Sequence, residues 1–304
     1  MPSLKAIRTR ITSVKNTRKI TRAMKLVSTA KLRRAQDALI AARPYTQAIS
    51  KVVSELGAVA GPDAHKLFEE RPLQKAAIVV MTSDRGQAGA FNANVTKAVE
   101  RYAANELSGA TEVSLRIIGR KGNQYFSRRR ATITSFDPSP IGATALDSAR
   151  ETANRVIADF LAGKVDRVFV VYNEFKNAAS QAVRVRQILP VVPEKVESLV
   201  GKGSAAAAAA HASAAAESTD FIYEPGKLEL LNRLVPLYVQ ILLYRAALES
   251  ITSFFASQMT AMENATKNAG DMISSLTLQF NRARQASITK ELAEIVGGAE
   301  ALKG

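Results

Sequence analysis

The sequence predicts a central α/β domain with a mostly parallel, Rossmann-like sheet and flanking helices, joined to a long antiparallel coiled coil made by the first and last helices. Three observations predict this fold class. Residues 3–58 have helical periodicity, residues 74–195 alternate strand and helix patterns, and a heptad repeat runs from Tyr223 to about Val296. The predicted divisions are 1–60 for the first helix, 73–195 for the α/β domain, 200–222 for an Ala-rich variable linker and 223–298 for the last helix.

The first helix is strongly basic. Residues 1–44 hold twelve Lys or Arg against one acid, Asp37, so this segment carries +11 of the chain's net charge of +15. An ordinary surface helix mixes its charges so that pairs four residues apart support it. The one-sided charge predicts an anionic partner, and the residues leave nucleic acid, a membrane surface and an acidic protein as candidates.

The first helix also carries a short apolar seam at heptad spacing, at Leu4, Ile7, Ile11 and Val14. Apolar residues then resume on a different face of the helix. We therefore expect the seam to slip between residues 14 and 20, which would locally unwind the supercoil. The seam positions that turn polar are Arg18, Thr21, Lys25 and Ser28, and the residues of the new face are Ile20, Met24 and Val27.

The last helix carries the clearest periodic signal. Sixteen positions between 231 and 283, spaced alternately three and four residues apart, hold thirteen apolar residues, which is typical of a coiled-coil seam. After Ala283 the seam positions turn polar, and apolar residues resume at Ile288, Leu292 and Ile295. We expect this second slip to lie opposite the slip in the first helix, as matching regions of one coil.

The middle of the chain predicts strands and helices in a β-α-β-α-β order, which implies parallel strands covered by helices. The basic stretch 120–130 is predicted to be a solvated surface, and the Ala-rich stretch 201–220 a partly disordered linker. Strands are expected at 75–83, 112–119, 164–175 and 181–191, and helices at 92–107 and 143–163.

No motif in the sequence assembles an active site. The chain has no Cys, and His65 and His211 are far apart, so thiol chemistry, a His-ligated metal site and a Ser/His/Asp triad are not expected. The segment SDRGQAGAFN (83–92) follows a strand and precedes a helix, but it lacks the P-loop Lys and fits neither glycine-rich phosphate motif. We expect a structural turn there, and no catalytic residue, cofactor or metal in the chain.

The alternatives for the basic helix differ in how well they fit. A bZIP-like nucleic-acid binder would need its zipper in the next heptads, whereas the heptad repeat lies about 200 residues away. A membrane-surface helix would need a broad apolar face, and the most apolar run, from Leu234, is interrupted by Gln240, Arg245 and Glu249, so no direct membrane insertion is expected. A protein partner with acidic loops is the remaining interpretation.

Three stretches resemble the gamma subunit family of F-type ATP synthases. The stretch RITSVKNTRKITRAMKLVSTAKLRRAQ (10–36) is similar to the first helix of that family, and SDRGQAGAFN (83–92) is similar to its SDRGLCGxFN stretch. The stretch ITKELAEIVGGAEAL (288–302) matches the family's C-terminal signature. The resemblance spans the start, middle and end of the chain, and leaves out only 201–220.

The resemblance implies a rotor and a non-catalytic subunit of an enzyme complex. In the family the two terminal helices turn inside a ring of three alpha and three beta subunits, and the α/β domain lies against the epsilon subunit and the membrane c-ring. Proton flow turns the rotor, which forces the beta sites through different nucleotide affinities. Because the family-like region begins at residue 3 with no transit peptide, we expect a peripheral protein on the cytoplasmic face of the bacterial plasma (inner) membrane, without nucleic acid as a partner.

The resemblance also implies which residues contact the beta subunit. Matching positions are Met24 and Lys25 in the first helix, and Arg284, Gln285, Thr289 and Glu291 in the last helix; Arg18, Arg22 and Arg282 are possible further contacts. This sequence departs from the family at Gln258, where Arg is usual, and at Gln87 and Ala88, where Leu and Cys are common.

Overall fold

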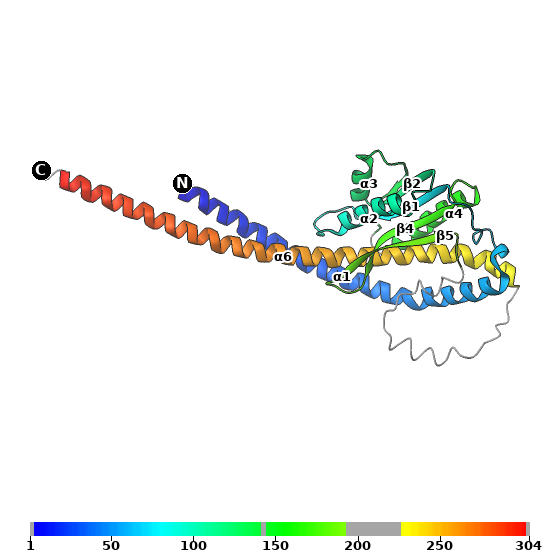
Figure 1. Cartoon of the computed structure of the whole chain (residues 1–304). Helices are drawn as coiled ribbons and strands as arrows, with labels where there is room; N and C mark the ends of the chain where they lie inside the picture. Colours follow the sequence, from blue (N-terminus) through cyan, green and yellow to red (C-terminus); the bar gives the residue numbers. More distant parts are fainter. Residues whose placement is uncertain (1–2, 141–143, 193–225, 302–304) are drawn as a thin grey trace. The chain divides into compact units, whose positions relative to one another are not determined.

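The computed structural model describes residues 3–140, 144–192 and 226–301. Two long helices enclose the other elements in sequence, as Figure 1 shows. The predicted linker 200–222 lies outside the described residues. The elements are α1 (Leu4–Ala60), a 3-10 turn (Pro62–Ala64), β1 (Lys75–Met81), α2 (Phe91–Asn105), β2 (Glu112–Ile118), α3 (Arg120–Ser127), β3 (Ile133–Asp137), α4 (Thr144–Leu161), β4 (Arg167–Phe175), β5 (Gln181–Leu189) and α6 (Lys227–Ala301).

The five strands form one sheet in the order β3-β2-β1-β4-β5. The first four strands are parallel, and β5 returns antiparallel to β4 as a hairpin. All residues of β1 except Lys75 are buried, because a central parallel strand is covered on both faces and therefore reads as a continuous apolar run. The mostly parallel sheet of the predicted fold class is confirmed.

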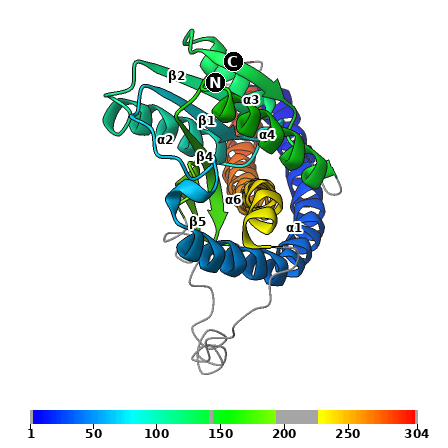
Figure 2. The same cartoon turned by 90° about the vertical axis from the view of Figure 1, so that its right-hand side faces the viewer.

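Two apolar cores lie on opposite faces of the sheet. One core joins alternate residues of β1 and β4 to α4, α6 and part of α1, and includes Val53, Phe160 and Leu243. The other core joins the opposite residues of the same strands to α2 and α3, and includes Ile78 and Val95. Figure 2 shows α2 and α6 on the two sides of the strands. The alternation of side chains along each strand explains how one sheet serves two cores.

The sequence-based order of elements was incomplete between residues 119 and 137. A short helix, α3, and an edge strand, β3, lie there, where only a basic solvated surface over 120–130 had been predicted. The strand has five residues and alternates between half-buried and exposed, so it lacks the apolar run that identifies a buried strand. With α3 and β3 included, strands and helices alternate regularly from β1 to β4.

The chain divides into two compact units, each of which contains part of both long helices. The coil unit holds the described residues up to Lys31 and those from Gln258 onward, and the sheet unit holds Leu32 to Ser257. The coil unit consists only of α1 and α6 segments. All strands and the shorter helices belong to the sheet unit.

Candidate partner-binding surface

The α1 and α6 segments of the coil unit pair antiparallel. The Ser28 hydroxyl donates to the side-chain oxygen of Gln258 at 2.9 Å, and the Lys25 ammonium lies 2.6 Å from Glu263. The Thr266 hydroxyl donates to the Thr21 hydroxyl at 2.8 Å. As the residue numbers fall from Ser28 to Lys25 to Thr21 along α1, the numbers of their partners rise from 258 to 263 to 266 along α6. The two helices therefore run antiparallel. The predicted coiled coil of the first and last helices is therefore confirmed.

The predicted slip in the α1 seam is wrong. Thr21 and Ser28 are only 9% and 1% exposed, whereas Ile20 and Val27 on the supposed new seam are 60% and 55% exposed. Among the polar seam positions, Thr21 and Ser28 are buried and Lys25 is half-buried, and only Arg18 is exposed, so the original heptad spacing continues. The physical reason is that these hydroxyls are satisfied inside the interface, by Thr266 and Gln258 across the coil and by backbone carbonyls of α1, so burying them carries little penalty.

The second predicted slip is wrong for a different reason, because the helix pairing ends there. Lys290 and Glu294 at the following seam positions are exposed, and Ile288 and Leu292 on the supposed new face are 48% and 57% exposed. The antiparallel register places the start of α1 at about residue 283 of α6. From there to Ala301, α6 runs on beyond the described part of α1, and its apolar residues face outward.

The two slip regions also do not lie opposite each other. A Cβ at Gly270 would come 3.9 Å from the Arg18 guanidinium, so Arg18 lies level with Gly270 and not with the 283–288 region. The expectation that matching breaks face each other failed because sequence periodicity gives each helix its seam but not the register between them.

The predicted contact residues form two patches instead of one. The lower-numbered patch holds Met24 and Lys25, which are half-buried beside α6, together with the exposed Arg18 and Arg22. The second patch holds the exposed Arg282, Arg284, Gln285, Thr289 and Glu291. Lys25 lies level with Glu263, and at 1.5 Å per residue the Arg284 level lies roughly 30 Å further along the helix axis. A single partner segment that contacted both patches would therefore have to span this distance.

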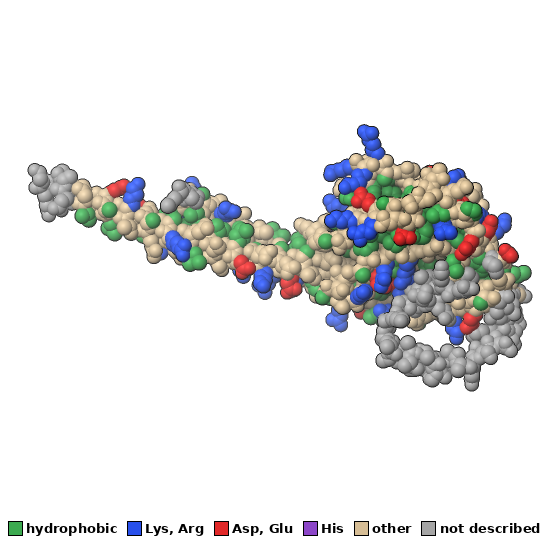
Figure 3. Space-filling view, viewed as in Figure 1, with side chains coloured by type: hydrophobic (Ala, Val, Ile, Leu, Met, Phe, Trp, Pro, Cys, Tyr) green, Lys and Arg blue, Asp and Glu red, His purple; other side chains and the backbone are tan. Residues whose placement is uncertain are grey.

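Each patch adjoins exposed apolar side chains, and all of them except Leu26 had been assigned to the coil seam from the sequence. Ile20, Leu26 and Val27 are exposed near the first patch, and Ile288 and Leu292 near the second. Figure 3 shows, on the face drawn, apolar side chains with a few basic and acidic ones along the two long helices. Exposed apolar groups rimmed by charge are typical of protein–protein contact sites. The sequence did not reveal that these residues are exposed, because apolar residues at helical spacing also predict a buried seam.

The SDRGQAGAFN segment is a structural turn, as predicted. The Ser83 backbone N–H donates to the Asn92 side chain at 3.0 Å, and the Ser83 hydroxyl donates to the Arg85 carbonyl at 2.6 Å. An Asp84 carboxylate oxygen accepts the backbone N–H groups of Arg120 and Ser139. These contacts join the end of β1 to the starts of α2 and α3. Ser83, Asp84 and Asn92 are thus used to hold the turn in place.

Two further features limit the chemistry of the described residues. Within these residues, no group of three His, Cys, Asp or Glu side chains is placed to hold a metal ion. One helix of the described chain, α6, is long and apolar enough to cross a membrane, with a window of mean hydropathy 1.3, of which 56% is buried inside the protein. Burial within the protein accounts for this apolarity, since a core helix has the same composition.

The fold and the surface together define a coiled-coil protein with an α/β sheet unit, whose coil unit exposes basic and apolar patches. Comparison with known proteins identifies its family. The family model described as ATP synthase matches residues 3–302. ATP synthase gamma chains from Anaeromyxobacter sp. (strain Fw109-5) and Geotalea uraniireducens are 47% and 43% identical, with 100% of each chain covered. The chain belongs to the ATP synthase gamma chain family.

Solved structures agree in fold. The chain matches the central stalk and c-ring structure of the Tetrahymena thermophila mitochondrial ATP synthase with a TM-score of 0.60 at 26% identity, covering 81% of this chain and 99% of that one. It matches the rotor of the Euglena gracilis mitochondrial ATP synthase with a TM-score of 0.62 at 18% identity, covering 94% and 98%. These findings give no support to the nucleic-acid-binding alternative.

Proposed function

We propose that this chain is the central rotor shaft of an F-type ATP synthase, coupling proton translocation through the membrane sector to ATP synthesis and hydrolysis at the beta subunits. Its partners are the alpha and beta subunits, the epsilon subunit and the membrane c-ring. As part of that complex it lies on the cytoplasmic face of the bacterial plasma membrane. Full-length similarity to gamma chains supports this role, and the observation that carries it is the coil unit with its two separate patches.

The geometry of the coil suits a part that turns inside a ring of like subunits. The first patch lies on a two-helix segment, and the second lies where α6 runs on past the start of α1. Neither segment has threefold symmetry, so three equivalent partners around the shaft meet different surfaces at any moment. A conformational equilibrium shifts only through differential contacts with its states. Rotation of the shaft would therefore bias each beta site in turn.

The proposed contacts are tested by replacing Arg284 and Gln285 together by Ala. Both side chains are exposed, so the free energy of unfolding should change by less than about 0.5 kcal/mol. Coupled ATP synthesis by membrane vesicles should fall, because the shaft loses a charged contact in the second patch. The control is Ser275→Ala with Gln279→Ala, two exposed polar residues of α6 between the levels of the two patches.

Assembly is measured separately, by isolating the complex and identifying its subunits. Normal assembly with a normal rate of ATP synthesis in the Arg284/Gln285 variant would show that the second patch is misplaced. Equal losses in this variant and in the control would show that the coil responds to any surface change. Isolation of the chain without alpha and beta subunits would refute the rotor function itself.

A further inference from the structure

A groove lined by polar and apolar side chains lies in the sheet unit. It has a volume of about 790 Å³ and is bounded by α4 and by the strands β2 and β3. This volume lies in the range of small-molecule sites, roughly 300–1,000 Å³. Alternation along β2 accounts for its polarity: Leu115 and Ile117 pack in the core shared with α2, and Glu112, Ser114 and Arg116 face the groove.

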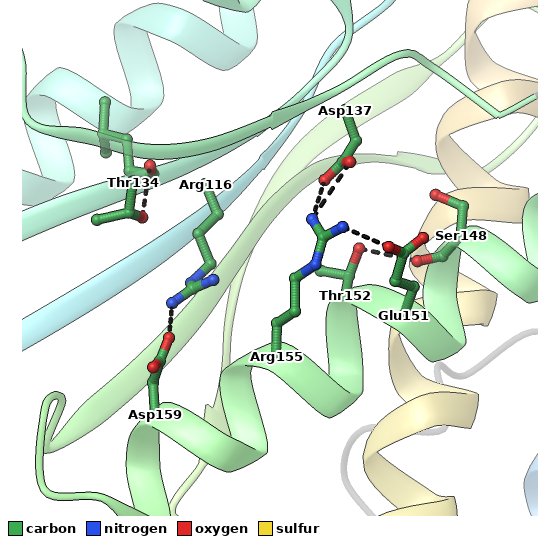
Figure 4. Close-up of polar contacts among 9 residues, drawn as sticks. Arg116, Thr134, Asp137, Ser148, Glu151, Thr152, Arg155 and Asp159 are labelled. Atoms are coloured by element: carbon green, nitrogen blue, oxygen red, sulfur yellow. Dashed lines mark hydrogen bonds and ion pairs between the residues drawn. The ribbon is translucent and has the colours of Figure 1, made fainter.

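Arg116 is the most unusual residue of the groove. It is 7% exposed, although it carries a charge. Its Nη2 forms an ion pair with Asp159 of α4, and its Nε is buried with no hydrogen-bond partner. Figure 4 shows Arg116 extending from β2 toward Asp159, with Arg155 beside it on α4. A buried donor without an acceptor costs about 1–3 kcal/mol, and in native proteins such a donor commonly meets an ion or water that is bound there.

The charges around Arg116 are not evenly balanced. Asp159 faces both Arg116 and Lys164, with its second oxygen 3.4 Å from Lys164, so one carboxylate serves two cations. Arg155, by contrast, is held by Asp137 at 2.9 Å and by Glu151. At the mouth of the groove, Lys75 lies in register with Glu112. An excess positive charge therefore remains at Arg116 and Lys164.

We propose that this groove binds a small molecule through an oxyanion group, a phosphate or a carboxylate. One oxyanion oxygen accepts from the Arg116 guanidinium, after a rotation of its outer side-chain bonds turns the Nε edge toward the groove. Lys164 and Lys75 contact the remaining oxygens. A guanidinium binds oxyanions through two parallel N–H donors. The second oxygen of the ligand would thus be the acceptor that the Arg116 Nε–H lacks. The ligand would join α4 to β2, independently of the shaft function.

The test is calorimetric titration of the full-length chain with inorganic phosphate and, separately, with succinate as a carboxylate probe. Ionic strength is held constant with NaCl so that screening is equal throughout. We expect saturable binding of at least one probe, weakened about tenfold by Lys164→Gln, a change of roughly 1.4 kcal/mol. Lys75→Gln should weaken binding in the same direction. The control is Lys97→Gln, an exposed lysine on α2, which covers the other face of the sheet.

Arg116→Gln is combined with Asp159→Asn, because removing Arg116 alone would leave the half-buried Asp159 carboxylate with only its 3.4 Å contact to the exposed Lys164. This double variant should retain the circular dichroism spectrum and lose binding. Binding of phosphate alone, or of succinate alone, supports the proposal and identifies the oxyanion. The proposal is overturned if neither probe gives saturable binding, or if the Lys164 variant and the Lys97 variant bind equally.

Discussion

The coil unit and the sheet unit use the same two helices but stabilise them with different chemistry. In the sheet unit, Val53 of α1 and Leu231, Val235 and Leu243 of α6 are completely buried. In the coil unit, the seam is narrow and includes the buried polar residues Thr21, Ser28 and Gln258. A helix packed against a sheet buries a broad apolar face, whereas a two-helix coil buries only a stripe. Local surroundings, and not helix length, therefore decide how much each segment contributes to stability.

Polar residues in the seam bury less apolar surface than Leu or Ile would, but they restrict how the two helices can align. A single polar residue at a seam position can fix the register of a coiled coil at a cost in stability. The bond between Ser28 and Gln258 and the bond between Thr21 and Thr266 exist only in the observed register. We infer that the coil unit opens locally at a lower free energy than the sheet unit, which local unfolding can reveal.

The largest expected effect comes from truncating a buried side chain of the sheet unit. Leu243→Ala removes a fully buried side chain from the core between α6 and the sheet and should lower the free energy of unfolding by about 2–5 kcal/mol. Leu276→Ala is the matched change in the coil unit, and should cost less than about 2 kcal/mol because the seam can close around the gap. Denaturant titration gives both values. Equal costs would contradict the contrast between the units.

Alkaline pH should weaken the sheet unit selectively. Burial, with a smaller contribution from Glu249, raises the pKa of Tyr172, and burial raises the pKa of Tyr238. The folded state thus holds these protons more tightly than the unfolded state. Their stabilising contribution is complete below about pH 10 and is lost as pH rises above it, by up to about 1.4 kcal/mol per pH unit for each group.

The two units can be separated in this experiment because the coil-unit segments contain no Tyr. Hydrogen exchange or denaturant titration between pH 9 and 11 should show the loss in the sheet unit. Tyr238→Phe is the informative variant, since its hydroxyl has no hydrogen-bond partner and its removal should cost little at neutral pH. A pH dependence that is unchanged by Tyr238→Phe would mean that this tyrosine does not contribute to it.

The polar seam is tested by a double-mutant cycle. Ser28→Ala removes the donor to Gln258 in a buried setting and should cost about 1–3 kcal/mol, because the Gln258 oxygen is left without that partner. Adding Gln258→Leu should recover most of this cost, since two apolar residues then meet across the seam. The free energies of the four proteins give the coupling energy. Additive effects would show that the bond does not stabilise the register.

Much of the fold could be predicted because periodicity identifies segments that bury one face. The α6 seam positions Phe255, Met262 and Leu276 are buried as the heptad repeat predicts. The supposed slips were not real, because counting apolar residues overlooks a buried hydroxyl whose partner is distant in the sequence. Ser28 and Gln258 are separated by 230 residues, and no local pattern links them.

The contact residues were predicted by resemblance, and their role remains a prediction. What the sequence could not supply was their arrangement, since the register between α1 and α6 depends on contacts such as Lys25 with Glu263. That register separates Met24 from Arg284 along the coil. The groove beside Arg116 was also invisible, because β3, which forms one of its walls, had not been predicted as a strand.

The smallest expected effect on stability concerns Lys25, and it is the sharpest test of the first patch. Its side chain is 36% exposed and that of Glu263 is 56% exposed, so Lys25→Ala should change the free energy of unfolding by no more than about 0.5 kcal/mol. Within the chain, however, Glu263 competes with any acidic partner for the same ammonium group. Lys25→Ala should therefore reduce ATP synthesis, whereas Glu263→Gln should preserve it or strengthen partner binding.

The two variants together distinguish a shaft contact from an internal pair. Glu263→Gln removes the acid within the chain and keeps Lys25 charged. A carboxylate of the partner can then bind Lys25 without first displacing Glu263. Unfolding measurements and ATP synthesis rates are compared at low and high salt, because screening weakens an exposed contact. If both variants reduce ATP synthesis equally, the Lys25–Glu263 pair itself is what the motor requires, and Lys25 acts by holding the two helices together.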